Sequence, residues 1–154
     1  MKAEYINPFF KATVDVFRIM LDLEVERGKL GVAEDLAPSK DASAVIGITG
    51  DLSGSILYSF PQDMVLEMVR IMSGMSLTKM DSFVGSALGE VANIISGNAM
   101  TNLSATQYLC DIVPPQVLIG KTASLSMATE KALVLPVITS IGDFEITISL
   151  RENK

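Results

Sequence analysis

A carboxylate and a carboxamide stand three residues apart near the middle of the chain, at Glu90 and Asn93. In a helix, residues three positions apart are neighbours on one face, so these two side chains would stand together. An ionised carboxylate accepts charge-assisted hydrogen bonds, and an amide both accepts and donates. The pair could therefore bind polar or charged groups that a partner molecule presents to this face.

The spacing alone carries little information, because Glu4 and Asn7 show it as well. There the pattern coincides with the start of a predicted helix. Asn7 is followed by Pro8, and an asparagine before a proline is typical of an N-cap followed by the first helical residue. We therefore interpret Asn7 as a helix cap and give the functional interpretation only to Glu90 and Asn93.

The segment that contains Glu90 and Asn93 is predicted to form a helix that begins at Asp81 and ends near Ser104. Each residue advances by about 100° around a helix axis. One side collects the apolar residues Val84, Leu88, Val91, Ala92, Ile95, Ala99 and Leu103. The opposite side collects Ser82, Ser86, Glu90, Asn93, Gly97 and Ser104. We expect the first side to be buried and the second to be open.

The open side is unusual because it is poor in the long charged residues that most solvated helices carry. It has Ser86 and Gly97 instead, with Gly89 close by. Each glycine costs a helix about 1 kcal/mol relative to alanine. Small residues would leave a flat surface for a docking macromolecule, but they would equally allow close packing against another helix of the same domain. Composition does not separate these two interpretations.

Two further helices are expected. The first follows Pro8 and shows an apolar stripe at Phe10, Val14, Phe17 and Leu21. The second begins at Pro61 and ends near Gly74, with Met64, Val65, Met68 and Met72 facing inward. These spacings of three and four residues are those of amphipathic helices.

Two hairpins are predicted from strand-forming residues that flank glycine–aspartate turns. Their strands are Ala44–Thr49 with Ser53–Ser59, joined at Gly50-Asp51, and Ala132–Thr139 with Phe144–Leu150, joined at Gly142-Asp143. Shorter strands are expected at Leu30–Glu34 and Gln116–Ile119. A long helix followed by a hairpin thus occurs in each half of the chain. We predict an α+β fold with one domain over residues 1–154, in which long helices pack on one face of a curved, mostly antiparallel sheet with a pseudo-two-fold internal repeat.

Composition excludes several classes of function. The 154 residues are 49% hydrophobic and carry a net charge of −6, without a basic cluster for nucleic acid. The chain has no histidine and one cysteine, which excludes imidazole bases, disulfides within the chain and thiolate zinc sites. Apolar runs are shorter than the roughly 20 residues that cross a bilayer, and the start does not resemble a signal peptide. We expect a soluble intracellular protein that binds neither nucleic acid nor membrane.

The helix around Glu90 resembles the signature helix of the CheC/CheX/FliY family of chemotaxis phosphatases over the run Ala87–Ala99 (ALGEVANIISGNA). That motif has a glutamate, two residues, an asparagine and, some twenty-odd residues later, a proline, here Pro114 or Pro115. The resemblance to CheX-type members extends over nearly the whole chain. It includes the runs Tyr5–Phe9 (YINPF), Val45–Gly50 (VIGITG), Gly54–Phe60 (GSILYSF) and Asp111–Pro115 (DIVPP).

The resemblance implies a cytoplasmic enzyme that removes the phosphoryl group from the aspartate of a CheY-like response regulator. In this role Asn93 would orient the attacking water, and Glu90 would pair with a lysine of the regulator. This chain would need no metal or cofactor, because the Mg²⁺ would belong to the regulator. Docking would involve Ser86, Gly89 and Gly97, together with the flanking residues Phe83, Ile94 and Thr101. The resemblance also implies a homodimer.

Other interpretations remain open. A non-catalytic adaptor related to flagellar-switch proteins would bind a response regulator without changing its phosphorylation. A structural oligomerisation module would use the small-residue helix face as a dimer interface. The first helix has no internal glutamate–asparagine pair at this spacing, so we expect one site in each chain.

Overall fold

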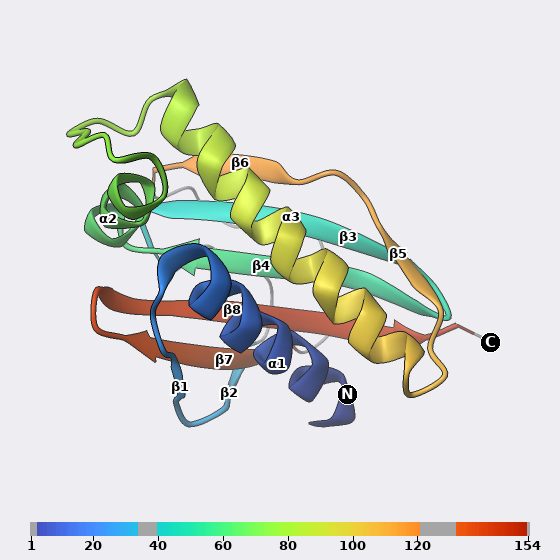
Figure 1. Ribbon diagram of the computed structural model, residues 1–154. Helices are drawn as coiled ribbons and strands as arrows, with labels where there is room; N and C mark the ends of the chain where they lie inside the picture. Colours follow the sequence, from blue (N-terminus) through green and yellow to red (C-terminus); the bar gives the residue numbers. More distant parts are fainter. Residues whose placement is uncertain (1–2, 34–39, 121–131, 154) are drawn as a thin grey trace.

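Three helices lie on one face of an antiparallel sheet in the computed structural model, which describes residues 3–33, 40–120 and 132–153 (Figure 1). The long helices are α1 (Ile6–Val16), which follows a 3₁₀ turn and continues into a π-helical segment at Phe17–Leu21, and α3 (Ser82–Ser104). The shorter α2 (Gln62–Ser73) lies at one end of the sheet. The predicted placement of the helices on one face of a sheet is confirmed.

The sheet has eight strands in the described part of the chain, and every pair of neighbours is antiparallel. The strands are β1 (Glu26–Arg27), β2 (Gly31–Ala33), β3 (Ala42–Gly50), β4 (Leu52–Phe60), β5 (Cys110–Ile112), β6 (Gln116–Ile119), β7 (Ala132–Thr139) and β8 (Gly142–Glu152). Their order is β1-β7-β8-β4-β3-β5, while β2 also pairs with β7 and β6 also pairs with β3.

This order has an internal two-fold pattern. The hairpins β3–β4 and β7–β8 meet at the central pair β4–β8. The short strands that follow α1 pair with β7, which belongs to the second half, and the short strands that follow α3 pair with β3, which belongs to the first half. Each half therefore completes the sheet of the other, and the predicted pseudo-two-fold repeat is confirmed.

The main core lies between the helices and the sheet. Alternate residues of the strands point toward the helices, which places Ile46, Tyr58 and Ile148 at zero exposure. Phe144 stacks between two other rings, with centroids 5.4 Å from Phe17 and 4.3 Å from Phe60. Burial of one such side chain contributes about 1.5–3 kcal/mol, so this layer fixes the helices on the sheet.

The predicted helices and hairpins are confirmed in position, with shifts at their ends. Asp81 caps α3, Pro61 precedes α2, and Gly74 ends α2 in the left-handed conformation. The predicted strand at 30–34 is three residues long, Gly31–Ala33, and residue 34 lies outside the described residues. The short strands β1 and β5 were not predicted, because two or three residues are too few to show a period.

Two local predictions are wrong. Asn7 is not a cap, because α1 already begins at Ile6, and the Asn7 side chain instead accepts a hydrogen bond from Arg27. Gly142 pairs with Thr139 at the start of β8, so the turn falls on residues 140–141 rather than on Gly142-Asp143. At Asn7 a contact with a distant residue replaces the capping role, and at Gly142 the register of the β7–β8 pair sets the position of the turn.

The buried stripe of the first helix also differs from the prediction. Phe17 and Leu21 are buried, but Phe10 and Val14 are only half-buried. The helix instead buries Phe9, Thr13 and Val16, each one position before a residue of the predicted stripe. This shift turns the buried side toward α3, against which α1 packs.

Replacement of Gly54 tests the central strand pair. Gly54 has a φ of +150°, and an added Cβ would collide with the carbonyl oxygen of Ser149 on β8. We expect Gly54→Ala to lower the free energy of unfolding by about 3 kcal/mol or more, through backbone strain and overpacking together. Chemical denaturation measures the change.

Gly120→Ala is the matched control for Gly54→Ala. Gly120 has a φ of +98°, but no atom lies within 4 Å of an added Cβ. Gly120→Ala should lower the free energy of unfolding only through backbone strain, by about 1–2 kcal/mol. Equal losses in the two variants would contradict the close β4–β8 approach.

Candidate active site

Helix α3 is fixed at its start by a side-chain cap and along its length by an apolar face. Asp81 Oδ1 accepts a hydrogen bond of 3.0 Å from the backbone N–H of Val84, which satisfies one of the free donors of the first turn. All seven residues predicted for the buried side are buried, namely Val84, Leu88, Val91, Ala92, Ile95, Ala99 and Leu103. The prediction of the buried face is therefore confirmed.

The opposite side of α3 is open, as the helical spacing predicts. Glu90 is exposed and Asn93 is half-buried, so neither lies sealed beneath other parts of the chain. Ser86 is exposed and Gly97 is half-buried. Three residues separate Glu90 from Asn93 in a continuous helix, which brings the carboxylate and the amide to the same stretch of surface.

Glu90 and Asn93 lie along a groove of about 880 Å³ that runs beside α3. The helix wall consists of Ser82, Gly85, Ser86, Gly89, Glu90 and Asn93. The opposite wall comes from the segment that contains β5 and β6, through Ile112, Pro114, Pro115 and Val117. One wall is therefore polar with small residues, and the other is apolar.

Gly89, which the helical spacing places close by the open face, is buried. A Cβ at Gly89 would lie 3.1 Å from Val117 Cγ2 and 3.7 Å from Pro115 Cγ. The absence of a side chain therefore allows β6 of the same chain to approach the helix, which explains this glycine by internal packing. Gly89 still lines the groove, so its contribution to docking stays a prediction.

Both candidate prolines line the groove, and they differ in burial. Pro114 is exposed, whereas Pro115 is half-buried and is the one that approaches Gly89. The pair interrupts the pairing of this segment with β3, since β5 ends at Ile112 and β6 begins at Gln116. The interruption forms the rim opposite Glu90 and Asn93.

The three flanking residues named for docking lie at different depths. Phe83 is 47% exposed, which is high for an aromatic side chain, and Thr101 is exposed. Ile94 is half-buried and packs against the core. Their contact with a partner stays a prediction.

The two-fold repeat allows α1 to be compared with α3. The buried residues of the two helices share one spacing, which aligns Pro8, Phe9, Ala12, Thr13, Val16 and Phe17 with Val91, Ala92, Ile95, Ser96, Ala99 and Met100. This alignment places Asn7 at the position of Glu90 and Phe10 at the position of Asn93.

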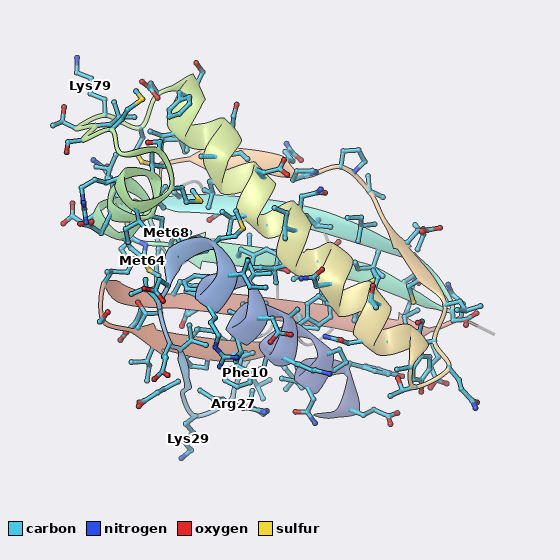
Figure 2. All side chains as sticks on the ribbon, in the orientation of Figure 1. Phe10, Arg27, Lys29, Met64, Met68 and Lys79 are labelled. Carbon is cyan, nitrogen blue, oxygen red and sulfur yellow. The ribbon has the colours of Figure 1, made fainter. Side chains whose placement is uncertain are left out.

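Arg27 contacts the residues at both of these positions on α1. Its Nη1 donates to Asn7 Oδ1 at 3.0 Å, and its guanidinium carbon lies 5.7 Å from the centre of the Phe10 ring (Figure 2). The related face of α1 thus has an amide in place of the acid and an aromatic ring in place of the amide. One site in each chain stays an expectation.

Among the described residues, no three histidine, cysteine, aspartate or glutamate side chains gather in a group that could hold a metal ion. None of the helices in residues 3–33, 40–120 and 132–153 is long and apolar enough to cross a membrane.

A family model, a curated protein and several solved structures match this chain. The family model described as "Chemotaxis phosphatase CheX" matches residues 42–138, which include β3, β4, all of α3 and the groove. The chain belongs to the CheX family. It is 29% identical to the CheY-P phosphatase CheX of Thermotoga maritima over 153 residues, 98% of either chain.

Solved structures of CheX proteins have the same fold. The chemotaxis protein CheX from Desulfovibrio desulfuricans is 30% identical and matches with a TM-score of 0.86, over 96% of this chain and 99% of that one. A CheX–CheY–BeF₃–Mg²⁺ complex from Borrelia burgdorferi contains a chain that is 31% identical, with a TM-score of 0.81 over 98% of this chain and 100% of that one.

Sequence reasoning missed the apolar wall of the groove and one polar contact beneath the helix. Ile112 and Val117 carry no local signal, because the pairing of β5 and β6 with β3 is what places them beside α3. Ser96 did carry a signal, since it is a polar residue on the apolar side of the helix, next to Ile95 and Ala99. It bonds to Tyr58.

The packing role of Gly89 can be tested by the same substitution at two glycines of α3. Gly89→Val should lower the free energy of unfolding by about 2 kcal/mol, because the new side chain overpacks against Val117. Gly97→Val should have a much smaller effect, because no atom lies within 4 Å of a Cβ there. Both changes add the same residue to the same helix. Equal stability of the two variants in urea denaturation would contradict this packing.

Proposed function

We propose that this chain is a phosphatase that hydrolyses the phospho-aspartate of a CheY-like response regulator. Membership of the CheX family and the similarity to a CheY-P phosphatase support this function. The observation that carries it is the open position of Glu90 and Asn93 beside a groove, on a helix face without long side chains.

In the proposed mechanism, Asn93 orients the attacking water. An acyl phosphate is labile, so catalysis consists mainly of placing a water in line with the phosphorus. The amide oxygen of Asn93 can accept a hydrogen bond from this water while its NH₂ group donates to a neighbouring acceptor. No side-chain base is needed, in keeping with a chain that has no histidine.

Glu90 is proposed to fix the docking register. Its exposed carboxylate can pair with a cation of the regulator, for which the lysine near the phosphorylated aspartate is the candidate. Since Glu90 precedes Asn93 by less than one turn, this ion pair would bring the amide to the phosphoryl group.

The shape of the surface supports docking of this face into a cleft. Ser86 and Gly97 add little bulk beside Glu90 and Asn93, so the helix can approach the regulator closely. Phe83, exposed at the start of α3, is proposed to contact the regulator outside its active-site cleft. The apolar wall at Pro115 and Val117 would exclude water from one side of the site.

We propose that this chain supplies no metal or cofactor and that the Mg²⁺ belongs to the regulator. The related complex from Borrelia burgdorferi contains both CheY and Mg²⁺. A cytoplasmic location follows from the proposed substrate. The homodimer implied by the family resemblance also stays a prediction, which light scattering of the purified chain can check.

The function is tested by the decay of a radiolabelled, phosphorylated regulator with wild type, Asn93→Ala and Glu90→Ala. Wild type should accelerate the decay, and Asn93→Ala should lower kcat about 100-fold, because the water is no longer placed. Glu90→Ala should mainly raise KM, because the ion pair sets docking. A regulator that binds the wild-type chain yet decays at its own rate would contradict the phosphatase and indicate a non-catalytic adaptor.

Close docking is tested by Gly97→Lys. The backbone there accepts a side chain, since no atom lies within 4 Å of an added Cβ, and the fold should be retained. A lysine would hold the helix away from the regulator and abolish the accelerated decay. Gly97→Ala is the control, which adds little bulk and should keep most activity. Normal dephosphorylation by folded Gly97→Lys would count against docking of this face.

A further inference from the structure

A buried hydrogen bond joins the underside of α3 to the middle of the sheet. Tyr58 Oη on β4 and Ser96 Oγ on α3 lie 2.7 Å apart, and both residues have zero exposure. Burial raises the pKa of Tyr58 far above its usual range, so the phenol stays neutral and keeps its proton for hydrogen bonding.

This hydrogen bond is a directional interaction within an otherwise apolar contact between α3 and the sheet. Beside Ser96, the buried face of α3 consists of apolar residues, among them Ala92, Ile95 and Ala99. Apolar packing has no preferred direction, whereas a hydrogen bond in an apolar interior is strong and sensitive to geometry. The Ser96–Tyr58 bond joins α3 to a strand of the sheet. A second side-chain hydrogen bond, from Asn102 Nδ2 to the carbonyl oxygen of Pro8, joins α3 to α1.

The bond is present in only one half of the two-fold repeat. Thr13 of α1 occupies the position that corresponds to Ser96, and it is also fully buried. Its hydroxyl donates to the carbonyl oxygen of Phe9 in its own helix, at 2.8 Å, rather than to the sheet. At this position of the repeat, α3 is thus bonded to the central strand β4, whereas the hydroxyl of α1 bonds within its own helix.

We propose that Tyr58 and Ser96 are positioning residues, which set the rotation of α3 about its axis and thereby the place of the Asn93 amide in the groove. Ser96 follows Asn93 by three residues, so a rotation at Ser96 moves Asn93 with it. This inference rests on the proposed function. A misplacement of about 1 Å at a reacting group can lower a rate by about 100-fold, so a small rotation has a measurable effect.

The test uses Tyr58→Phe, Ser96→Ala and the double variant. Ser96→Ala should be the least stable, because it leaves a buried phenol without a partner. In Tyr58→Phe, the Ser96 hydroxyl can bond to the carbonyl oxygen of Ala92 in its own helix. The double variant removes both polar groups and should recover much of the stability lost in Ser96→Ala.

Activity should follow a different order from stability. We expect kcat for the phosphorylated regulator to fall at least about tenfold in all three variants, with KM nearly unchanged, because the outer surface is intact. The double variant should be stable again but still slow. All assays are made well below the unfolding temperature of the weakest variant.

Tyr108→Phe is the control. Its hydroxyl bonds to Glu4 and Glu152, away from the buried face of α3, and kcat should stay at the wild-type value. The positioning role would be overturned if the double variant had the wild-type kcat, or if the kcat of the single variants simply followed their stability. Either result would leave the phosphatase assignment intact. A wild-type chain that does not accelerate the decay would overturn both.

Discussion

The orientation of α3 about its own axis is the constraint on which the rest of the site depends. One side of the helix is buried against the sheet, and this burial makes Glu90 and Asn93 face outward. The apolar residues supply most of the free energy, while the Tyr58–Ser96 bond adds direction. Even a small rotation of the helix would carry the amide away from its place in the groove, because Asn93 lies on the side opposite the buried face.

The groove exists because an internally symmetric fold carries different side chains in its two halves. Each long helix lies beside short strands that complete the sheet of the other half. Beside α1, the guanidinium of Arg27 lies over the Phe10 ring. Beside α3, the interrupted strand at Pro114 and Pro115 forms an open rim. Gly89 sets how closely that rim approaches the helix. The same framework therefore carries an arginine over an aromatic ring beside one helix and a groove with an acid and an amide beside the other.

The sequence predicted what local periodicity can determine. The 23-residue helix α3, its start at Asp81, its buried face and the hairpin β3–β4 all follow from spacing and turn residues. What it could not predict depends on contacts between distant residues. Arg27 takes Asn7 away from a capping role, and Val117 reaches Gly89 only because β6 pairs with β3. The acid–amide pair itself was visible because it lies within one helical turn.

The most direct test of the central claim is a crystal structure of this chain bound to its response regulator, trapped in a phosphorylated-like state. The account predicts that α3 enters the active-site cleft, with the Asn93 amide within hydrogen-bond distance of the position in line with the phosphorus and Glu90 paired with a lysine of the regulator. A complex in which the regulator lies on another face, with Glu90 and Asn93 still facing solvent, would contradict it.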